Sequence, residues 1–298
     1  MKKYILLLCT AIFLMAACKK EEPTPSDLDA YHAAPEQNFP ATAAVIYDAV
    51  TDIDGNHYDA VRIGEQIWMA SNLRTKHYPN GDTIMRGEGR ALSYTDPYRY
   101  SPTNNAALYG YLYNWTAVMH GEAASNRNPS GVQGICPDGW HVPSRAEWEQ
   151  LISYCSSQSE CTCNGSSNHI AKSLAADHSW NLSDVACAVG NDLNSNNYTG
   201  FSAIPVGYYT LTDYPDVVGE CLYSGVLALY SCSSVYNYQF ADNAYFSNDD
   251  TSISLIYGGY CIGNSVRCER FYPIIFERKD GFAFHINETV FPVLHYQS

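Results

Sequence analysis

The first 17 residues constrain the chain most, because they set the compartment in which the rest must fold. Lys2 and Lys3 precede an uncharged, mostly apolar run from Tyr4 to Ala17. This run is shorter than the roughly 20 apolar residues that a membrane-spanning helix needs. A short basic segment followed by a short apolar one is typical of an export signal. We therefore expect residues 1–17 to be a cleaved signal peptide.

The end of this signal resembles a bacterial lipobox. Residues 14–18 read LMAAC, one residue off the commonest lipobox spacing. The resemblance implies cleavage before Cys18 and lipid attachment to its thiol and amine, which would give a stable membrane anchor. The alternative is an ordinary cleaved signal followed by a chance cysteine.

Residues 18–44 are expected to be a flexible tether, because the KKEEPTPSD stretch is too polar and proline-rich to pack. Its Lys20-Glu21-Glu22 sequence resembles the surface-export signal of Bacteroidetes lipoproteins. That resemblance implies an outer-membrane lipoprotein exposed on the cell surface. Anchoring in the periplasmic leaflet is the alternative.

Charge and cysteine content narrow the function further. The formal charge is −14, and losing the two lysines of residues 1–17 would make it −16. Such an acidic chain does not attract nucleic acid through its net field.

Many cysteines in an exported chain predict disulfides. Nine remain after Cys9 and Cys18, an odd number, so at least one thiol stays unpaired: Cys136, Cys155, Cys161, Cys163, Cys187, Cys221, Cys232, Cys261 and Cys268.

Residues 45–69 predict a β-hairpin, with a turn at Asp54-Gly55-Asn56 between two β-prone runs. The nearby aspartates also suggest a calcium loop. An EF-hand loop needs glycine at position six and glutamate at position twelve. With Gly55 at position six, position twelve is Val61. The calcium motif fails, and we expect no metal or other cofactor.

The stretch GICPDGWHVPSRAEWEQL, residues 134–151, predicts the start of a helix. Ser144 and Glu147 form a capping box, and Pro143 keeps the preceding residue extended. Trp148 and the apolar residues that follow it lie on one helical face, which is typical of a buried helix. His141 has no acid or nucleophile at motif spacing nearby, so we interpret it as a hydrogen-bonded structural residue rather than a catalytic one.

Three further segments have coarser predictions. Apolar spacing over 108–119, LYGYLYNWTAVM, predicts an amphipathic helix with Trp115 in the core. Short apolar runs over 200–268 predict irregular strands. The tail, 271–298, predicts three short strands with turns at 279–281 and 287–288.

The cysteine-rich segment 155–187 is expected to form local disulfides. Cys161 and Cys163 are too close together to bond to each other comfortably. Zinc is the alternative, with His169 and His178 nearby, but the paired spacing typical of zinc sites is missing.

Five blocks together resemble the Fibrobacter succinogenes major paralogous domain, over roughly residues 45–270. They occur in this order: DIDGNHYDAVRIGEQIWMASNLR, LYGYLYNWTAVM, GICPDGWHVPSRAEWEQL, GFSAIPVGY and NSVRCER. The resemblance implies an exported domain without assigned biochemistry. It also implies an α+β, C-type-lectin-like fold with a twisted antiparallel sheet, two helices and long irregular loops. In that fold Cys136 and Cys268 would form a disulfide.

Three function classes remain open. The favoured one is a lipid-anchored, non-catalytic binding module for glycan or a macromolecular partner. The chain lacks the Glu-Pro-Asn and Gln-Pro-Asp loops of calcium-dependent lectins, so such binding would not need calcium. The candidate ligand face consists of tyrosines in the loop-rich region: Tyr208, Tyr209, Tyr214, Tyr223, Tyr236 and Tyr238.

The first alternative to a binding module is a structural or assembly subunit of an outer-membrane surface complex. The less favoured alternative is an enzyme related to formylglycine-generating folds, which depend on late cysteines such as Cys261 and Cys268. The sequence has no nucleophile elbow, zinc-protease helix or phosphate loop, so no catalytic residue is assigned.

Overall fold

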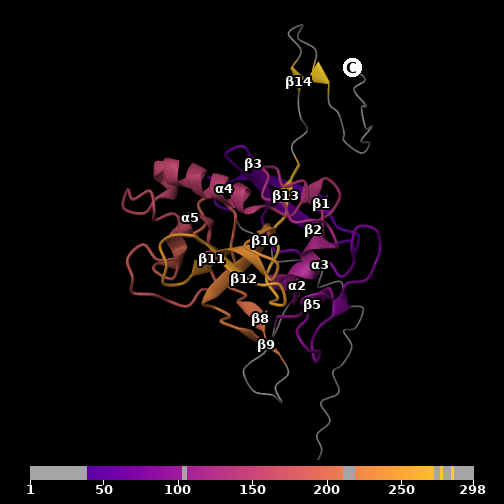
Figure 1. Ribbon diagram of the computed structural model, residues 1–298. Helices are drawn as coiled ribbons and strands as arrows, with labels where there is room; N and C mark the ends of the chain where they lie inside the picture. The colour runs from indigo at the N-terminus through magenta and orange to yellow at the C-terminus, as the bar shows by residue number, and fades with distance from the viewer. Residues whose placement is uncertain (1–38, 103–105, 211–218, 272–275, 278–282, 285–298) are drawn as a thin grey trace, which may run out of the picture. The chain divides into compact units, whose positions relative to one another are not determined.

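The computed structural model describes residues 39–102, 106–210 and 219–271, and the backbone of two short strands at 276–277 and 283–284. The predicted signal peptide and Cys18 lie outside the described residues, as does most of the tether. The described part is mixed α and β, with mostly antiparallel strand pairs, so the α+β class is confirmed (Figure 1). Its α-helices are α2 (Ala106–Tyr109), α3 (Trp115–Met119), α4 (Arg145–Ser157) and α5 (Ala171–Leu174).

One sheet of the described part is antiparallel and has five strands. Its strands, in spatial order, are β1 (Ala44–Thr51), β2 (His57–Ile63), β3 (Gln66–Met69), β13 (Glu269–Arg270) and β7 (Trp140–His141). The turn predicted at 54–56 joins β1 to β2, which confirms that hairpin. β13 enters from far along the chain and pairs Glu269 with both Trp68 and His141. The sheet therefore brings distant sequence blocks together.

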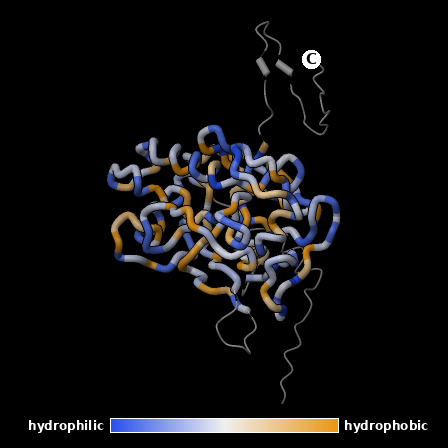
Figure 2. The backbone as a smooth tube through the Cα atoms, in the orientation of Figure 1, coloured by the Kyte–Doolittle hydropathy of each residue, from blue (hydrophilic) through white to orange (hydrophobic). Residues whose placement is uncertain are grey.

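Both faces of this sheet are buried. Because successive strand residues point to opposite faces, Trp68 of β3 enters one core cluster while Ile67 and Met69 enter another. In the first cluster the Trp68 and Trp148 rings lie 4.8 Å apart. Figure 2 shows the apolar segments concentrated inside the described body, with polar segments in the peripheral loops. This two-sided packing fixes the strands that carry His141 and Glu269.

A three-stranded antiparallel sheet forms next to α4. It consists of β10 (Leu227–Val235), β11 (Phe240–Ser247) and β12 (Ser254–Gly259), in that order. Ala228 and Ala244 contribute to the same core cluster as Trp148, so α4 covers one face of this sheet. The remaining strands form one three-stranded sheet and two pairs. The sheet consists of β4 (Met85–Arg86), β5 (Tyr98–Tyr100) and β6 (Leu112–Tyr113), and the pairs are β8 (Tyr208–Thr210) with β9 (Glu220–Leu222) and β14 (Phe276–Glu277) with β15 (Ala283–Phe284).

Helix α4 begins as predicted. The Ser144 hydroxyl accepts a hydrogen bond from the Glu147 amide, and the Glu147 carboxylate accepts one from the Ser144 amide. Trp148, Leu151 and Cys155 are buried on one face of the helix. The capping box and the buried stripe are therefore confirmed.

The single helix predicted over 108–119 is wrong. Residues 106–109 form α2, residues 112–113 form β6 and residues 115–119 form α3. Gly110 breaks the pattern because it has φ +79° and approaches the backbone of Leu73, where a Cβ would lie 2.7 Å from the carbonyl oxygen. Asn114 then starts α3 by accepting a hydrogen bond from the Ala117 amide. Trp115 is only partly buried.

Four of the described cysteines form two disulfides. One joins Cys136 to Cys268, the pair implied by the family resemblance, with a Cα–Cα distance of 5.9 Å. The other joins Cys163 to Cys187, which confirms a local disulfide in the cysteine-rich segment. Because these two sulfurs are bonded to each other, neither can serve as a ligand in the zinc alternative. Cys155 and Cys161 are buried, and their thiols hydrogen bond to each other.

β14 and β15 pair antiparallel, which confirms two of the three predicted tail strands. The third strand and both predicted tail turns lie outside the described residues. Among the described helices, none has the length and apolar character to cross a membrane.

Candidate functional site

The structure separates the predicted tyrosine face into different places. Tyr208 and Tyr209 lie on β8, and Tyr223 lies in the turn before β10. Tyr236 and Tyr238 lie in the turn between β10 and β11. Tyr214 lies outside the described residues. The described tyrosines of the predicted face thus come from several elements. Ring stacking joins Tyr208 to Tyr223, whereas Tyr236 stacks on Tyr257, a residue outside the predicted set.

Tyr209 is a correction to the predicted face. Its side chain is only 2% exposed, and its ring stacks on Tyr100 at 3.9 Å. The alternation of β8 points Tyr209 inward because its neighbours Tyr208 and Thr210 point outward. A buried ring cannot contact a ligand, so Tyr209 is a core residue. Tyr208 is half-buried and stacks on the exposed Tyr223 at 5.7 Å.

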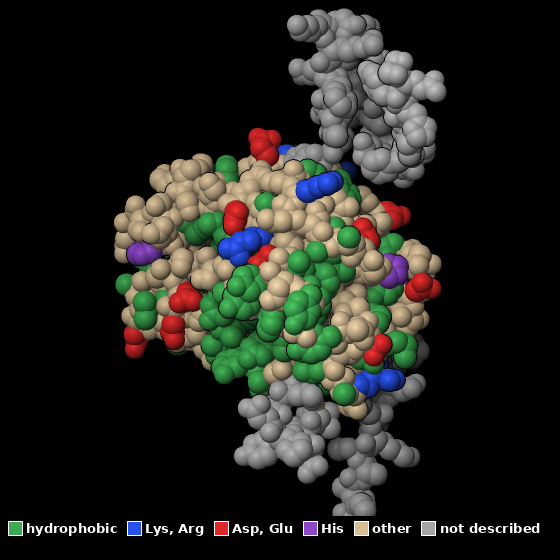
Figure 3. Space-filling model, in the orientation of Figure 1, with side chains coloured by type: hydrophobic (Ala, Val, Ile, Leu, Met, Phe, Trp, Pro, Cys, Tyr) green, Lys and Arg blue, Asp and Glu red, His purple; other side chains and the backbone are tan. Residues whose placement is uncertain are grey.

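The exposed aromatic residues of the β10–β11 turn meet a tyrosine from β12. The rings of Tyr236 and Tyr257 stack at 4.5 Å with an interplanar angle of 11°. They are 63% and 56% exposed, and Tyr238 is 83% exposed. Phe240 packs its edge against Tyr257 at 5.9 Å. We call Tyr236, Tyr238, Phe240 and Tyr257 the aromatic turn. Figure 3 shows hydrophobic side chains gathered on the face where β11 and β12 lie in Figure 1.

Hydrogen bonds hold the backbone of the aromatic turn in place. The Tyr236 amide donates to the Phe240 carbonyl, and the Asn237 side chain accepts from the Gln239 and Phe240 amides. The Tyr260 hydroxyl donates to the Asn237 carbonyl at 2.9 Å. These contacts fix the backbone of the turn, and the stacking of Tyr236 on Tyr257 orients those two rings.

Sequence reasoning found Tyr236 and Tyr238 but missed Tyr257 and Phe240. The missing signal is strand register, in which Phe240 pairs with Gly259 and Asp242 pairs with Tyr257. The register places Phe240 and Tyr257 on the same face of the sheet. No local motif predicts this pairing.

A second feature is an open polar pocket at the β1–β2 turn. Its volume is about 260 Å³. It is lined by Thr51, Asp52, Ile53, Thr75, His77, Pro79, Ile135, Pro137 and Asp138. We call it the His77 pocket.

Asp54 orients His77 at this pocket. One Asp54 oxygen lies 2.5 Å from His77 Nδ1, and the other accepts hydrogen bonds from the Thr75 hydroxyl and the Lys76 amide. Burial alone would raise the pKa of Asp54. The hydrogen bonds from Lys76, His77 and Thr75 outweigh that effect, so the pKa of Asp54 is lowered. Asp54 is therefore a carboxylate at neutral pH and accepts a hydrogen bond from the Nδ1–H group of His77.

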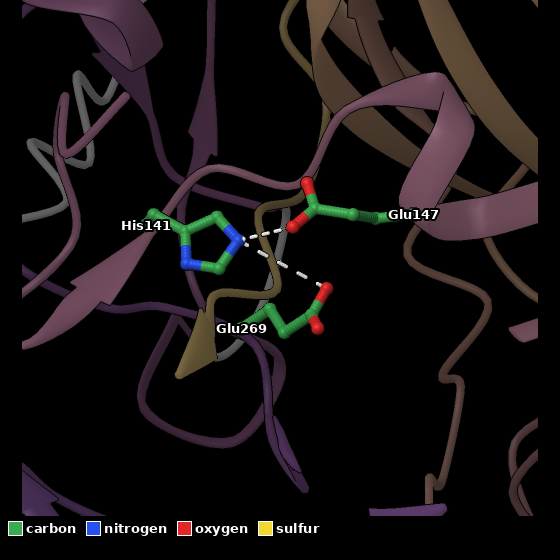
Figure 4. Close-up of side chains that lie close together, drawn as sticks. All are labelled: His141, Glu147 and Glu269. Atoms are coloured by element: carbon green, nitrogen blue, oxygen red, sulfur yellow. Dashed lines mark hydrogen bonds and ion pairs between the residues drawn. The ribbon is translucent and has the colours of Figure 1, made fainter. Parts of the chain in front are cut away.

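A third feature is the buried His141 cluster, formed by His141, Glu147 and Glu269 (Figure 4). His141 Nε2 lies 2.6 Å from Glu147 Oε1 and 4.0 Å from Glu269 Oε2. The other Glu147 oxygen accepts hydrogen bonds from the Ser130 and Ser144 amides. His141 is buried and hydrogen-bonded, as predicted. The sequence shows no acid at motif spacing from His141, but the fold places two beside it, because Glu147 is six residues away on α4 and Glu269 arrives from β13.

Glu269 has a different environment from Glu147. Burial, together with the charge of Glu147, raises the pKa of Glu269 to about 9. Glu269 is therefore a neutral carboxylic acid at pH 7, and Gln66 Nε2 donates to its Oε2 at 3.1 Å. Ligand atoms of the three cluster residues lie within 4.8 Å of one another, close enough to share a cation or a proton. The His141–Glu147 hydrogen bond therefore connects β7 to α4, and Gln66 of β3 holds Glu269 of β13 beside them.

The segment that contains β3, β7 and α4 matches a known family. The profile described as Fibrobacter succinogenes major domain (Fib_succ_major) matches residues 61–225, more than half of the chain. The chain belongs to this family. The match within this Fib_succ_major protein ends before β10, so the aromatic turn, Cys268 and Glu269 lie beyond the matched residues. Searches of curated proteins and of solved structures returned no match.

Proposed function

We propose that this Fib_succ_major protein is an exported, lipid-anchored, non-catalytic binding module that captures glycan on the aromatic turn. One observation carries the proposal: Tyr236 and Tyr257 stack on each other while more than half of each side chain stays exposed. Burying apolar ring surface is favourable, so exposed and preordered rings indicate a surface that a partner covers.

Glycan suits this surface for a chemical reason. A sugar ring presents apolar C–H groups on its faces and hydroxyls at its edge. Tyrosine offers a flat apolar ring and a hydroxyl that hydrogen bonds, and it loses little conformational entropy on binding. The neighbouring Tyr238 extends the surface with an 83% exposed ring.

The proposal includes a location and a finer fold assignment. Cleavage before Cys18 and its acylation would tether the domain through residues 18–44 to the outer membrane, with the domain on the cell surface. The antiparallel sheets and long irregular segments support a C-type-lectin-like fold. The sequence lacks calcium-lectin motifs, so the proposed capture does not require calcium.

The alternative proposal is a structural subunit of a surface complex. β12 lies at the edge of its sheet, and no described strand pairs with its outer side. Such an edge accepts a strand from another protein. Mild crosslinking followed by native purification would then recover a fixed partner. An enzyme of the formylglycine-generating type has less support, because the Cys268 sulfur is bonded to Cys136.

A glycan and polysaccharide array tests the main proposal. The probe is the oxidised protein from residue 19 to residue 298, applied with calcium and with chelator. We expect at least one glycan to bind equally in both conditions. A blank array with correctly disulfide-bonded protein would contradict glycan capture for the glycans displayed.

A further inference from the structure

We propose that the His77 pocket is a separate binding site for a single sugar ring. It lies at the β1–β2 turn, whereas the aromatic turn lies between β10 and β11. The inference therefore does not depend on capture by the aromatic turn.

The carboxylates and the imidazole that line the pocket differ in how many hydrogen bonds they already make. Asp54 holds Nδ1 of His77, which leaves Nε2 as the ring nitrogen without a described partner. Asp138 is exposed, and only one of its oxygens accepts a described hydrogen bond, from Gln133 Nε2 at 2.9 Å. In contrast, Asp52 already accepts from Asn56 and Tyr58. His77 and Asp138 are therefore the groups that can bind ligand hydroxyls.

The same three chain segments also supply apolar lining residues. These are Ile53, Pro79, Ile135 and Pro137. A lining that combines apolar side chains with a carboxylate and an imidazole matches a ligand that carries both hydroxyls and C–H groups. A monosaccharide unit has this chemistry. A fully coordinated divalent cation would need more oxygen or nitrogen ligands than these two residues supply.

The size and rigidity of the pocket point to a single ring. Its volume of about 260 Å³ is slightly below the roughly 300–1,000 Å³ usual for drug-sized ligands. Two covalent or buried supports hold its walls. Cys136, between the lining residues Ile135 and Pro137, is bonded to Cys268. The Asp52 carboxylate fixes the β1–β2 turn because it accepts hydrogen bonds from the Asp54 amide, the Asn56 amide and the Tyr58 hydroxyl.

Saturation-transfer NMR with free monosaccharides tests this site. The panel is glucose, galactose, mannose, xylose, fucose and N-acetylglucosamine, added singly to the oxidised protein. We expect at least one sugar to show transfer. Asp138→Asn and His77→Ala should each weaken its affinity at least tenfold. Asp184→Asn, an exposed aspartate outside the pocket lining, is the matched control and should change nothing.

The outcomes separate this site from the aromatic turn. Transfer that survives Tyr236→Ala/Tyr257→Ala but is lost in Asp138→Asn supports the pocket. Transfer that is lost only in the tyrosine variant overturns the pocket while supporting the proposed function. No saturation transfer from the folded protein to any of the sugars overturns the pocket. A Zn²⁺ or Ca²⁺ titration that perturbs the Asp138 region in place of a sugar also overturns it.

Discussion

His141 Nε2 lies 2.6 Å from Glu147 Oε1, and neither side chain is exposed to solvent. The same Glu147 side chain caps α4 and holds the Ser130 amide. One carboxylate therefore connects the start of the long helix to β7 and to the loop before it. The nearby Glu269 is also buried, but its carboxyl group is uncharged at pH 7. This difference in charge between the two buried glutamates can be tested.

Replacing Glu147 should cost far more stability than replacing Glu269. Glu147→Gln places an amide NH₂ group against backbone amides that now donate to a carboxylate, and each buried donor left unsatisfied costs about 1–3 kcal/mol. Glu269→Gln keeps a neutral group of similar shape and should change the free energy of unfolding by about 1 kcal/mol or less. Urea unfolding at pH 7 measures both. Equal losses in the two variants would contradict the assignment of charge.

The raised pKa of Glu269 also predicts how stability depends on pH. The folded state keeps this proton up to about pH 9, whereas an unfolded glutamate loses it near pH 4.3. Between these values the folded state holds more protons than the unfolded state. The contribution of the Glu269 proton to the free energy of unfolding is therefore full below about pH 4.3 and is lost as pH rises towards 9.

Glu269→Gln provides the matched control for this pH effect. Urea midpoints from pH 5 to pH 9 should fall more steeply in the wild-type protein than in Glu269→Gln. Identical slopes for the two proteins would show that Glu269 does not retain its proton in the folded state.

The two disulfides should contribute unequally to stability. The Cys136–Cys268 bond spans 132 residues and the Cys163–Cys187 bond spans 24. Loop-closure entropy gives about 5 kcal/mol for the first and about 3–4 kcal/mol for the second. Thermal and urea unfolding of the two paired Cys→Ala variants measures the order. A larger loss from the shorter loop would contradict the prediction.

Local sequence signals predicted local structure well. The β1–β2 turn and the α4 capping box depend on residues within a few positions of each other, so the sequence alone identifies them. The helix predicted over 108–119 failed because Gly110 packs against the Leu73 backbone, a contact that a periodic pattern does not contain.

The candidate sites depend on distant contacts, which the sequence does not reveal. Tyr257 joins Tyr236 only through the register of β11 and β12. Glu269 reaches His141 only because β13 lies between β3 and β7. Tyr209 was predicted on the surface and is buried, since nothing in its local sequence indicates which side of β8 packs on Tyr100.

The most direct test of glycan capture compares wild-type protein with Tyr236→Ala/Tyr257→Ala on the best glycan from the array. Tyr47→Ala, which removes a 72% exposed tyrosine from β1, is the matched control. We predict that the double variant binds at least tenfold more weakly, equivalent to about 1.4 kcal/mol, while Tyr47→Ala binds like wild type. Unchanged affinity in the folded double variant would contradict the central claim that the aromatic turn is the glycan-binding surface.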